Sequence, residues 1–202
     1  MKYLRPFVLL LPLLLNPAIT TAASGGTPTG TDKDALAAQA REVVRQYAES
    51  LQKTLKATIM TSGPASAVKT CKVHAPGISD QTAALTGWQV ARTSDKVRNP
   101  AHRPNRWEAE VLQEFSRKAR AGIPVEQLET YDVVQENGQP VFRYMKAIEV
   151  KNLCLNCHGP QVSGPVKAAI DDLYPGDQAT GYRLGDLRGA FTLRKPLNTA
   201  TD

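Results

Sequence analysis

Apolar side chains in the first third of the chain recur at steps of three and four residues, which predicts one long helix with a single buried stripe. Asp32 or Asp34 is expected to cap the start of this helix, and Ser62-Gly63-Pro64 is expected to end it. The stripe consists of Leu36, Ala40, Val43, Val44, Tyr47, Leu51, Leu55 and Ile59.

A second, shorter helix is expected from about Ala65 to His74, with Pro76-Gly77 as its end. Val68 and Cys71 share one face of this helix, because residues three or four apart are neighbours on a helix surface. The N-terminal part of the domain is therefore predicted to be helical.

The pattern then changes to strand-like alternation over residues 87–93, followed by a polar loop over residues 98–105. Asn105 is expected to cap a further helix, which Gly122 and Pro124 end. Its buried stripe contains Trp107, Val111, Leu112, Phe115 and Ala119.

Asn137-Gly138 is a strong signal for a β-hairpin, here between strands over residues 131–135 and 141–150. A short helix over residues 166–173 and a strand over residues 190–193 complete the pattern. Helices followed by antiparallel strands indicate an α+β domain with its sheet in the second half of the chain.

The N-terminal residues resemble a signal peptide, with a short basic start, an apolar run over residues 7–15 and small residues at 20–23. The run is about half of the roughly 20 residues that a membrane span needs. We therefore expect cleavage of residues 1–23, export to the periplasm and no stable membrane span afterwards. Residues 24–34 are then a flexible leader, 35–195 the folded domain and 196–202 a C-terminal tail.

The 202 residues suffice for one domain with its own core, and their formal net charge is +6. Removal of residues 1–23 deletes Lys2 and Arg5 and no acidic residue, which lowers the net charge to +4. Basic and acidic residues are interspersed, so we expect no nucleic-acid partner.

The segment Cys154-Leu155-Asn156-Cys157-His158 has the composition of a covalent haem c attachment site. Cys154 and Cys157 are spaced to form thioethers with the two vinyl groups of one haem, and His158 follows as the proximal iron ligand. A zinc site would need more ligands than the pair supplies. A thioredoxin-like dithiol should open a helix in a βαβ unit, whereas this pair follows a hairpin strand.

The second axial ligand remains open on the residues alone. The methionines of the mature chain, Met60 and Met145, both precede the motif, unlike the downstream methionine of the commonest cytochrome fold. Cys71 is the leading candidate, because iron binding would protect an otherwise unpaired thiol from oxidation. Cys71 could instead be a buried thiol or form an intermolecular disulfide. His74 is the rival ligand, and His102 is expected to serve nothing at the iron.

Beyond the haem motif, four sets of segments are distinctive: residues 67–71 with 75–76, 92–94 with 98–100 and 107–108, 142–148, and 174–191. They resemble the c-type haem-binding family long catalogued as a domain of unknown function, whose structural prototype is a cyanobacterial photosystem-associated protein. The resemblance covers about residues 35–195.

The resemblance implies a PAS-like α+β fold with an antiparallel sheet, a long N-terminal helix and flanking helices around one covalent haem. It also implies axial ligation by the motif histidine and a cysteine of an N-terminal helix, which correspond to His158 and Cys71. The family also occurs as the extracytoplasmic input module of membrane-bound signalling proteins, an arrangement from which this sequence departs.

These features predict a periplasmic monohaem protein for redox sensing or electron transfer, with a redox or signalling protein as its partner. The alternatives are sensing of NO or CO by displacement of the distal ligand, and catalysis on a sulfur compound or peroxide. We assign no catalytic residue, because no acid or base is recognisable beside the haem. Arg92, Arg143 and Arg188 are equal candidates for contacts with the haem propionates.

Overall fold

The first third of the chain forms one helical element, α1 (Gly30–Thr86), which bends sharply at Gly63. The computed structural model describes residues 30–197, so the expected signal peptide and residues 198–202 lie outside it. The helix starts at Gly30, before Asp32 and Asp34 and within the segment expected to be a flexible leader.

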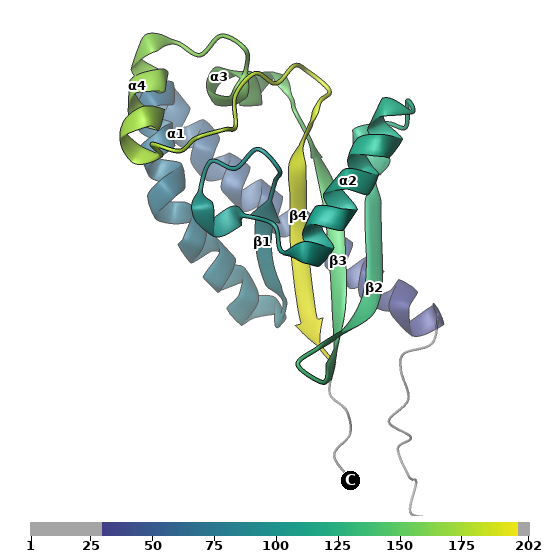
Figure 1. Ribbon diagram of the computed structural model, residues 1–202. Coiled ribbons are helices and arrows are strands. Elements are labelled where there is room, and N and C mark those ends of the chain that lie inside the picture. Colours follow the sequence, from purple (N-terminus) through teal and green to yellow (C-terminus); the bar gives the residue numbers. More distant parts are fainter. Residues whose placement is uncertain (1–29, 198–202) are drawn as a thin grey trace, which may run out of the picture.

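The bend in α1 confirms the break expected at Ser62-Gly63-Pro64. Gly63 adopts φ 79° and ψ 169°, a conformation open mainly to glycine, and Pro64 follows it. Beyond the bend the chain runs back toward the first half of the helix (Figure 1). Tyr47 Oη and Ser79 Oγ are 2.9 Å apart and hydrogen-bonded, which joins the two halves.

The expectation that Pro76-Gly77 ends the second helix was wrong, because α1 continues through both residues to Thr86. A proline inside a helix removes one backbone hydrogen bond. Packing offsets that cost here, since Ala75 is buried and Ile78 packs against the main core cluster. Tertiary contacts therefore override a local stop signal.

Four antiparallel strands form one sheet: β1 (Gln89–Thr93), β2 (Glu129–Glu136), β3 (Gln139–Glu149) and β4 (Leu187–Pro196). Their order is β1-β4-β3-β2, so the first strand pairs with the last. The predicted hairpin joins β2 to β3 through Asn137 (φ 52°) and Gly138 (φ 79°), as a two-residue turn of this type requires. The α+β expectation is thus confirmed.

The remaining helices are short apart from α2 (Arg106–Arg120), which Asn105 caps as predicted through a capping box with Glu108. The motif lies in η3 (Asn152–Cys154) and α3 (Leu155–His158), and α4 (Gly164–Leu173) follows. Two further single-turn 3₁₀ helices are η1 (Pro100–His102) and η2 (Val125–Gln127).

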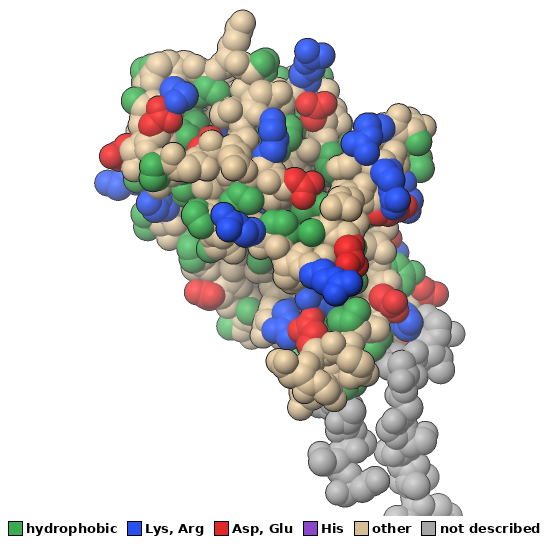
Figure 2. All heavy atoms as spheres, viewed as in Figure 1, with side chains coloured by type: hydrophobic (Ala, Val, Ile, Leu, Met, Phe, Trp, Pro, Cys, Tyr) green, Lys and Arg blue, Asp and Glu red, His purple; other side chains and the backbone are tan. Residues whose placement is uncertain are grey.

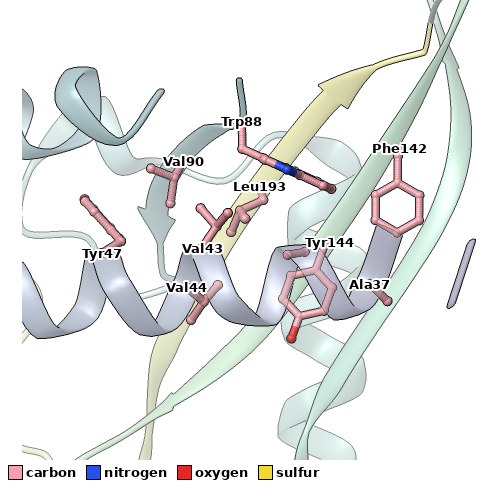
Figure 3. Packing of buried hydrophobic residues seen from close by; sticks show 10 residues of the cluster. Ala37, Val43, Val44, Tyr47, Trp88, Val90, Phe142, Tyr144 and Leu193 are labelled. Carbon is pink, nitrogen blue, oxygen red and sulfur yellow. The ribbon is translucent and has the colours of Figure 1, made fainter. Parts of the chain in front are cut away.

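The sheet lies between α1 on one face and α2 on the other, while α3 and α4 lie at one end beside the bend of α1 (Figure 1). Phe142 and Tyr144 of β3 face α1, and the alternate residues Met145 and Ala147 face α2. Figure 3 shows the α1 side, where Val43 and Tyr47 pack against sheet residues that include Leu193.

A buried polar network links α2 to the sheet. Glu108 Oε1 accepts hydrogen bonds from Arg143 Nη2 at 3.0 Å and from Thr192 Oγ1 at 2.7 Å. The side chains of Arg143 and Glu108 are only 7% and 10% exposed, so each compensates the buried charge of the other.

On the surface, acidic and basic side chains are interspersed over the face that carries α2 (Figure 2). Within residues 30–197, no helix has the length and apolar character that a membrane crossing requires.

Glu108→Ala should lower the free energy of unfolding by about 2 kcal/mol, because the buried Arg143 guanidinium loses one of its two carboxylate partners and Thr192 loses its acceptor, while Glu136 still pairs with Arg143. Urea denaturation measures the change. Glu110→Ala on the exposed face of α2 is the matched control, and it should have little effect. Equal stability of the two variants would contradict a buried ion pair.

Candidate functional site

The segment Cys154–His158 leaves β3 almost directly and is anchored at its base by backbone pairing. Val150 N–H donates to Asp186 O at 2.9 Å, and Gly185 N–H donates to Val150 O at 2.9 Å. Gly159 ends α3, and a Cβ at this position would lie 2.6 Å from Leu155 O. Glycine is therefore required directly after His158, a constraint that the sequence analysis missed.

The loop after α4 fixes the ring of His158. His158 Nδ1 lies 2.7 Å from Ala179 O, and a carbonyl only accepts, so Nδ1 carries the proton. Nε2 is then the nitrogen with a lone pair. A metal-binding histidine is held in this way when its other ring nitrogen donates to a backbone carbonyl.

Further contacts hold the same loop against the motif. Tyr182 N–H donates to His158 O at 2.9 Å, and the Tyr182 ring meets the imidazole edge-on at 6.4 Å. Burial, followed by the positive charges of Arg188 and Arg98, lowers the pKa of His158 to about 3. The imidazole is thus neutral at physiological pH, as ligation by nitrogen requires.

Arg98 connects the polar loop after β1 to both parts of the site. Its guanidinium pairs with Asp177 through Nε at 2.9 Å and Nη2 at 3.1 Å. The same Nη2 donates to Cys157 O at 2.7 Å and to Ala179 O at 3.3 Å. Arg98 therefore positions the motif and the carbonyl that holds His158.

Sequence reasoning gave Arg98 and Asp177 no role at the site. Both lie in segments that carry the family resemblance, which was the available signal. Their side chains are 12% and 6% exposed, so the pair is buried.

The bend of α1 brings Cys71 close to the motif. Val68, three residues earlier, packs in one cluster with Cys157 and with Ile170 of α4. The charges of Cys71 and Cys154 both act to raise the pKa of Cys157, a second sign that the cysteines are close together. All three are free thiols.

The environment of Cys71 differs from that of its rival. The Cys71 thiol is partly buried, and burial raises its pKa, while the charges of Arg92 and Arg98 act in the opposite direction. His74 is exposed on α1. The fold therefore directs Cys71, rather than His74, toward the motif.

The structure distinguishes between the three arginines that are candidates for contacts with the haem propionates. Arg143 belongs to the buried network with Glu108, under α2. After burial, the charge of Arg188 is the next contribution to the lowered pKa of His158, while the charge of Arg92 opposes the rise that burial causes in the pKa of Cys71. His102, given no role by the sequence, lies near the same two arginines: burial and then their charges lower its pKa to about 4.

These donors fit a covalently attached haem. Two free cysteines at two-residue spacing are available for thioethers, and His158 offers Nε2 with its tautomer fixed. Across the described chain, no three His, Cys, Asp or Glu side chains converge as they would around a metal ion that they alone hold. With a porphyrin supplying the other ligands, the iron would need only one axial donor on each side.

Comparison with known proteins gives the family. A model of the Tll0287-like family, described as Tll0287, matches residues 29–196. The solved crystal structure of the cyanobacterial heme-protein Tll0287 is similar, with 26% sequence identity and a TM-score of 0.55. The match covers 78% of this chain and 95% of that chain. A search of curated proteins finds no match.

Asp177→Asn should lower the free energy of unfolding at pH 7 by roughly 2 kcal/mol, because a charge-assisted pair with Arg98 is lost. The hydrogen bond and charge of Arg98 outweigh burial and hold the pKa of Asp177 below its ordinary value. The stabilisation is thus complete above the unfolded-state pKa, about 3.9, and is lost as pH falls through the native-state pKa.

Chemical denaturation of the wild type and of Asp177→Asn from pH 7 to pH 3 tests this, and their difference should shrink below about pH 4. Asp171→Asn on the exposed face of α4 is the control, with a small and more uniform effect. A pH-independent difference for Asp177→Asn would show that the ion pair is not its source.

Proposed function

This chain belongs to the Tll0287-like family, and we propose that it is an exported monohaem c-type protein that transfers or senses electrons. In this proposal Cys154 and Cys157 attach the haem, His158 binds the iron on the proximal side, and Cys71 binds it on the distal side. The similar solved structure, by its title a heme-protein, supports the presence of haem.

The observation that carries the proposal is the convergence of Cys71 on the Cys154–His158 motif. These residues come from α1 and α3, far apart in the sequence, and the bend at Gly63 and the packing of Val68 against Cys157 bring them together. A protein that needed only the attachment motif would not require this approach of a third cysteine.

When bound, haem supplies an iron centre that exchanges one electron. The hydrogen bond from His158 Nδ1 to Ala179 O orients the ring and makes Nε2 a stronger metal ligand. Cys71 must lose its proton to bind, and although burial raises the pKa of this thiol, the nearby charges of Arg92 and Arg98 offset part of that rise. With both axial positions filled by protein, a change of oxidation state needs little rearrangement, which suits electron transfer.

A second function, sensing of NO or CO, is favoured by the partial burial of Cys71. Burial raises the pKa of this thiol and so favours its protonated form. If haem is held by His158 and Cys71, its reduced iron would attract the anionic sulfur less strongly, and Cys71 would take up a proton from solvent on release. The haem would then be able to bind a diatomic gas.

The attachment is tested by haem retention during acid-acetone extraction and denaturing electrophoresis. Haem should stay with the wild-type chain, because thioether bonds survive both treatments, and Cys154→Ala with Cys157→Ala should lose it completely. Cys71→Ala is the matched control, which should keep covalent haem. Haem that washes out of the wild type would refute the proposal.

Cys71→Ala should raise the reduction potential and remove the low-spin thiolate signature from the ferric EPR spectrum. A thiolate stabilises ferric over ferrous iron by its negative charge. Each tenfold change in that preference corresponds to about 59 mV for a one-electron couple. Potentiometric titration with optical detection measures the shift.

His74→Ala is the control for this experiment, because His74 is exposed on the same helix, and both readouts should stay unchanged. If Cys71→Ala is silent and His74→Ala turns the haem high-spin, the distal ligand is His74. Rapid CO binding to the ferrous wild type, with loss of the thiolate signature, would favour sensing over electron transfer.

A further inference from the structure

Two partly buried arginines beside the site lack an acidic partner. Within residues 30–197, neither Arg92 nor Arg188 forms an ion pair with a carboxylate, although the charge of Arg92 acts on Cys71 and that of Arg188 acts on His158. Placing a charge away from water is costly unless an opposite charge compensates it. The two positive charges therefore favour binding of an anion beside them.

A β-bulge between β3 and β4 sets the direction of the Arg188 side chain. The register of β3 against β4 shifts so that Ile148 pairs with Gly189 but Glu149 pairs with Leu187, which leaves Arg188 as an extra residue. Such bulges redirect a side chain. The acceptors of Arg188 within the described chain are both neutral: Ser94 Oγ at 2.8 Å and Lys96 O at 3.4 Å.

Close packing fixes this bulge. Gly189 has φ 150°, and a Cβ there would lie 2.3 Å from Thr93 O. The guanidinium of Arg188 lies over the Tyr182 ring at 5.3 Å, and that ring meets His158 edge-on. Arg188 is thus held beside the predicted proximal ligand.

Arg92 comes from the neighbouring strand β1. It lies on β1 opposite Phe191 and on the same face as Val90, which packs in the cluster under α1. Its Nε is shielded from solvent and has no hydrogen-bond partner in the part of the chain that the structure describes. A buried donor without an acceptor loses its hydration without replacement.

The charges around the site do not balance within the protein. Burial and the neighbouring charges of Arg98 and Arg92 lower the pKa of Arg188, so the like charges repel one another. Asp177 is the carboxylate among them, and it is already engaged by both Nε and Nη2 of Arg98. Among the described residues, neither Arg92 nor Arg188 therefore has a carboxylate partner of its own.

We propose that Arg92 and Arg188 bind the two propionate carboxylates of the haem. The inference rests on the proposed function, because it requires haem at Cys154 and Cys157. Propionates lie at the edge of the porphyrin away from its vinyl groups. In keeping with this, the arginine charge acting on Cys157 is that of Arg98.

The test is the reduction potential of the covalent holoprotein as a function of pH. Without an arginine, a propionate is more easily protonated, so the pH range in which the potential rises on acidification should move upward in Arg92→Gln and Arg188→Gln. Above that range the potential should fall, because an unpaired propionate stabilises ferric iron. Arg92→Lys and Arg188→Lys keep the charge and should restore most of the wild-type profile.

Other titratable groups lie near these arginines, so their contribution to the pH profile must be the same in every variant. His102 of η1 is coupled to both, while Asp177 and Tyr182 face Arg188 from the loop after α4. Cys71 faces Arg92 from α1. All variants are therefore compared in a His102→Gln background and only in the pH range where optical spectra show unchanged axial ligation.

Arg183→Gln is the matched control, an exposed arginine next to Tyr182, and its profile should match that of its parent. If the Gln variants keep covalent low-spin haem and the parent profile, the inference is wrong while the proposed function stands. A profile that depends on added acetate would assign the arginines to a free anion and also overturn it. Wild-type protein without covalent haem would instead refute the proposed function.

Discussion

The contact of Arg98 with three acceptors holds the site together. One guanidinium binds Asp177, the carbonyl of Cys157 and the carbonyl of Ala179, which also accepts from His158. Three segments that no strand pairing joins thus meet at one buried ion pair. Because a planar guanidinium offers several donors in fixed directions, lysine in its place would lose most of these contacts. The position of the imidazole depends on this geometry.

The residues that stabilise the sheet are not those that form the site. The clusters that α1 and α2 form against the sheet contain most of the buried residues of the core clusters, and none of these residues belongs to the predicted haem site. Two smaller clusters surround the motif cysteines: Cys157 packs with Val68 and α4, and Cys154 packs with Val150 and Ala179. The chain thus holds its reactive residues in a cap at one end of the sheet.

Sequence reasoning succeeded where local chemistry decides structure. The cap at Asn105, the Asn137-Gly138 turn and the break at Gly63 each depend on a few adjacent residues. It failed at Pro76-Gly77, where packing of Ile78 on a distant cluster outweighs the local signal. It also gave no role to Arg98, and it could not separate Arg143 from Arg92 and Arg188. An arginine's role depends on which carboxylates the fold brings near it, which periodicity does not encode.

The separation of the cap from the sheet suggests a route by which a porphyrin ring enters the folded protein. Regions stabilised by small clusters open more readily than the main core, so the cap can unfold locally while the sheet persists. Ile78 and the hydrogen bond between Tyr47 and Ser79 tie the half of α1 that carries Cys71 to the main core, so the motif and α4 can open without displacing Cys71. In the proposed haem protein, the two motif cysteines would then be accessible to a porphyrin while Cys71 stays in place, and closure of the motif would bring the attached ring against Cys71.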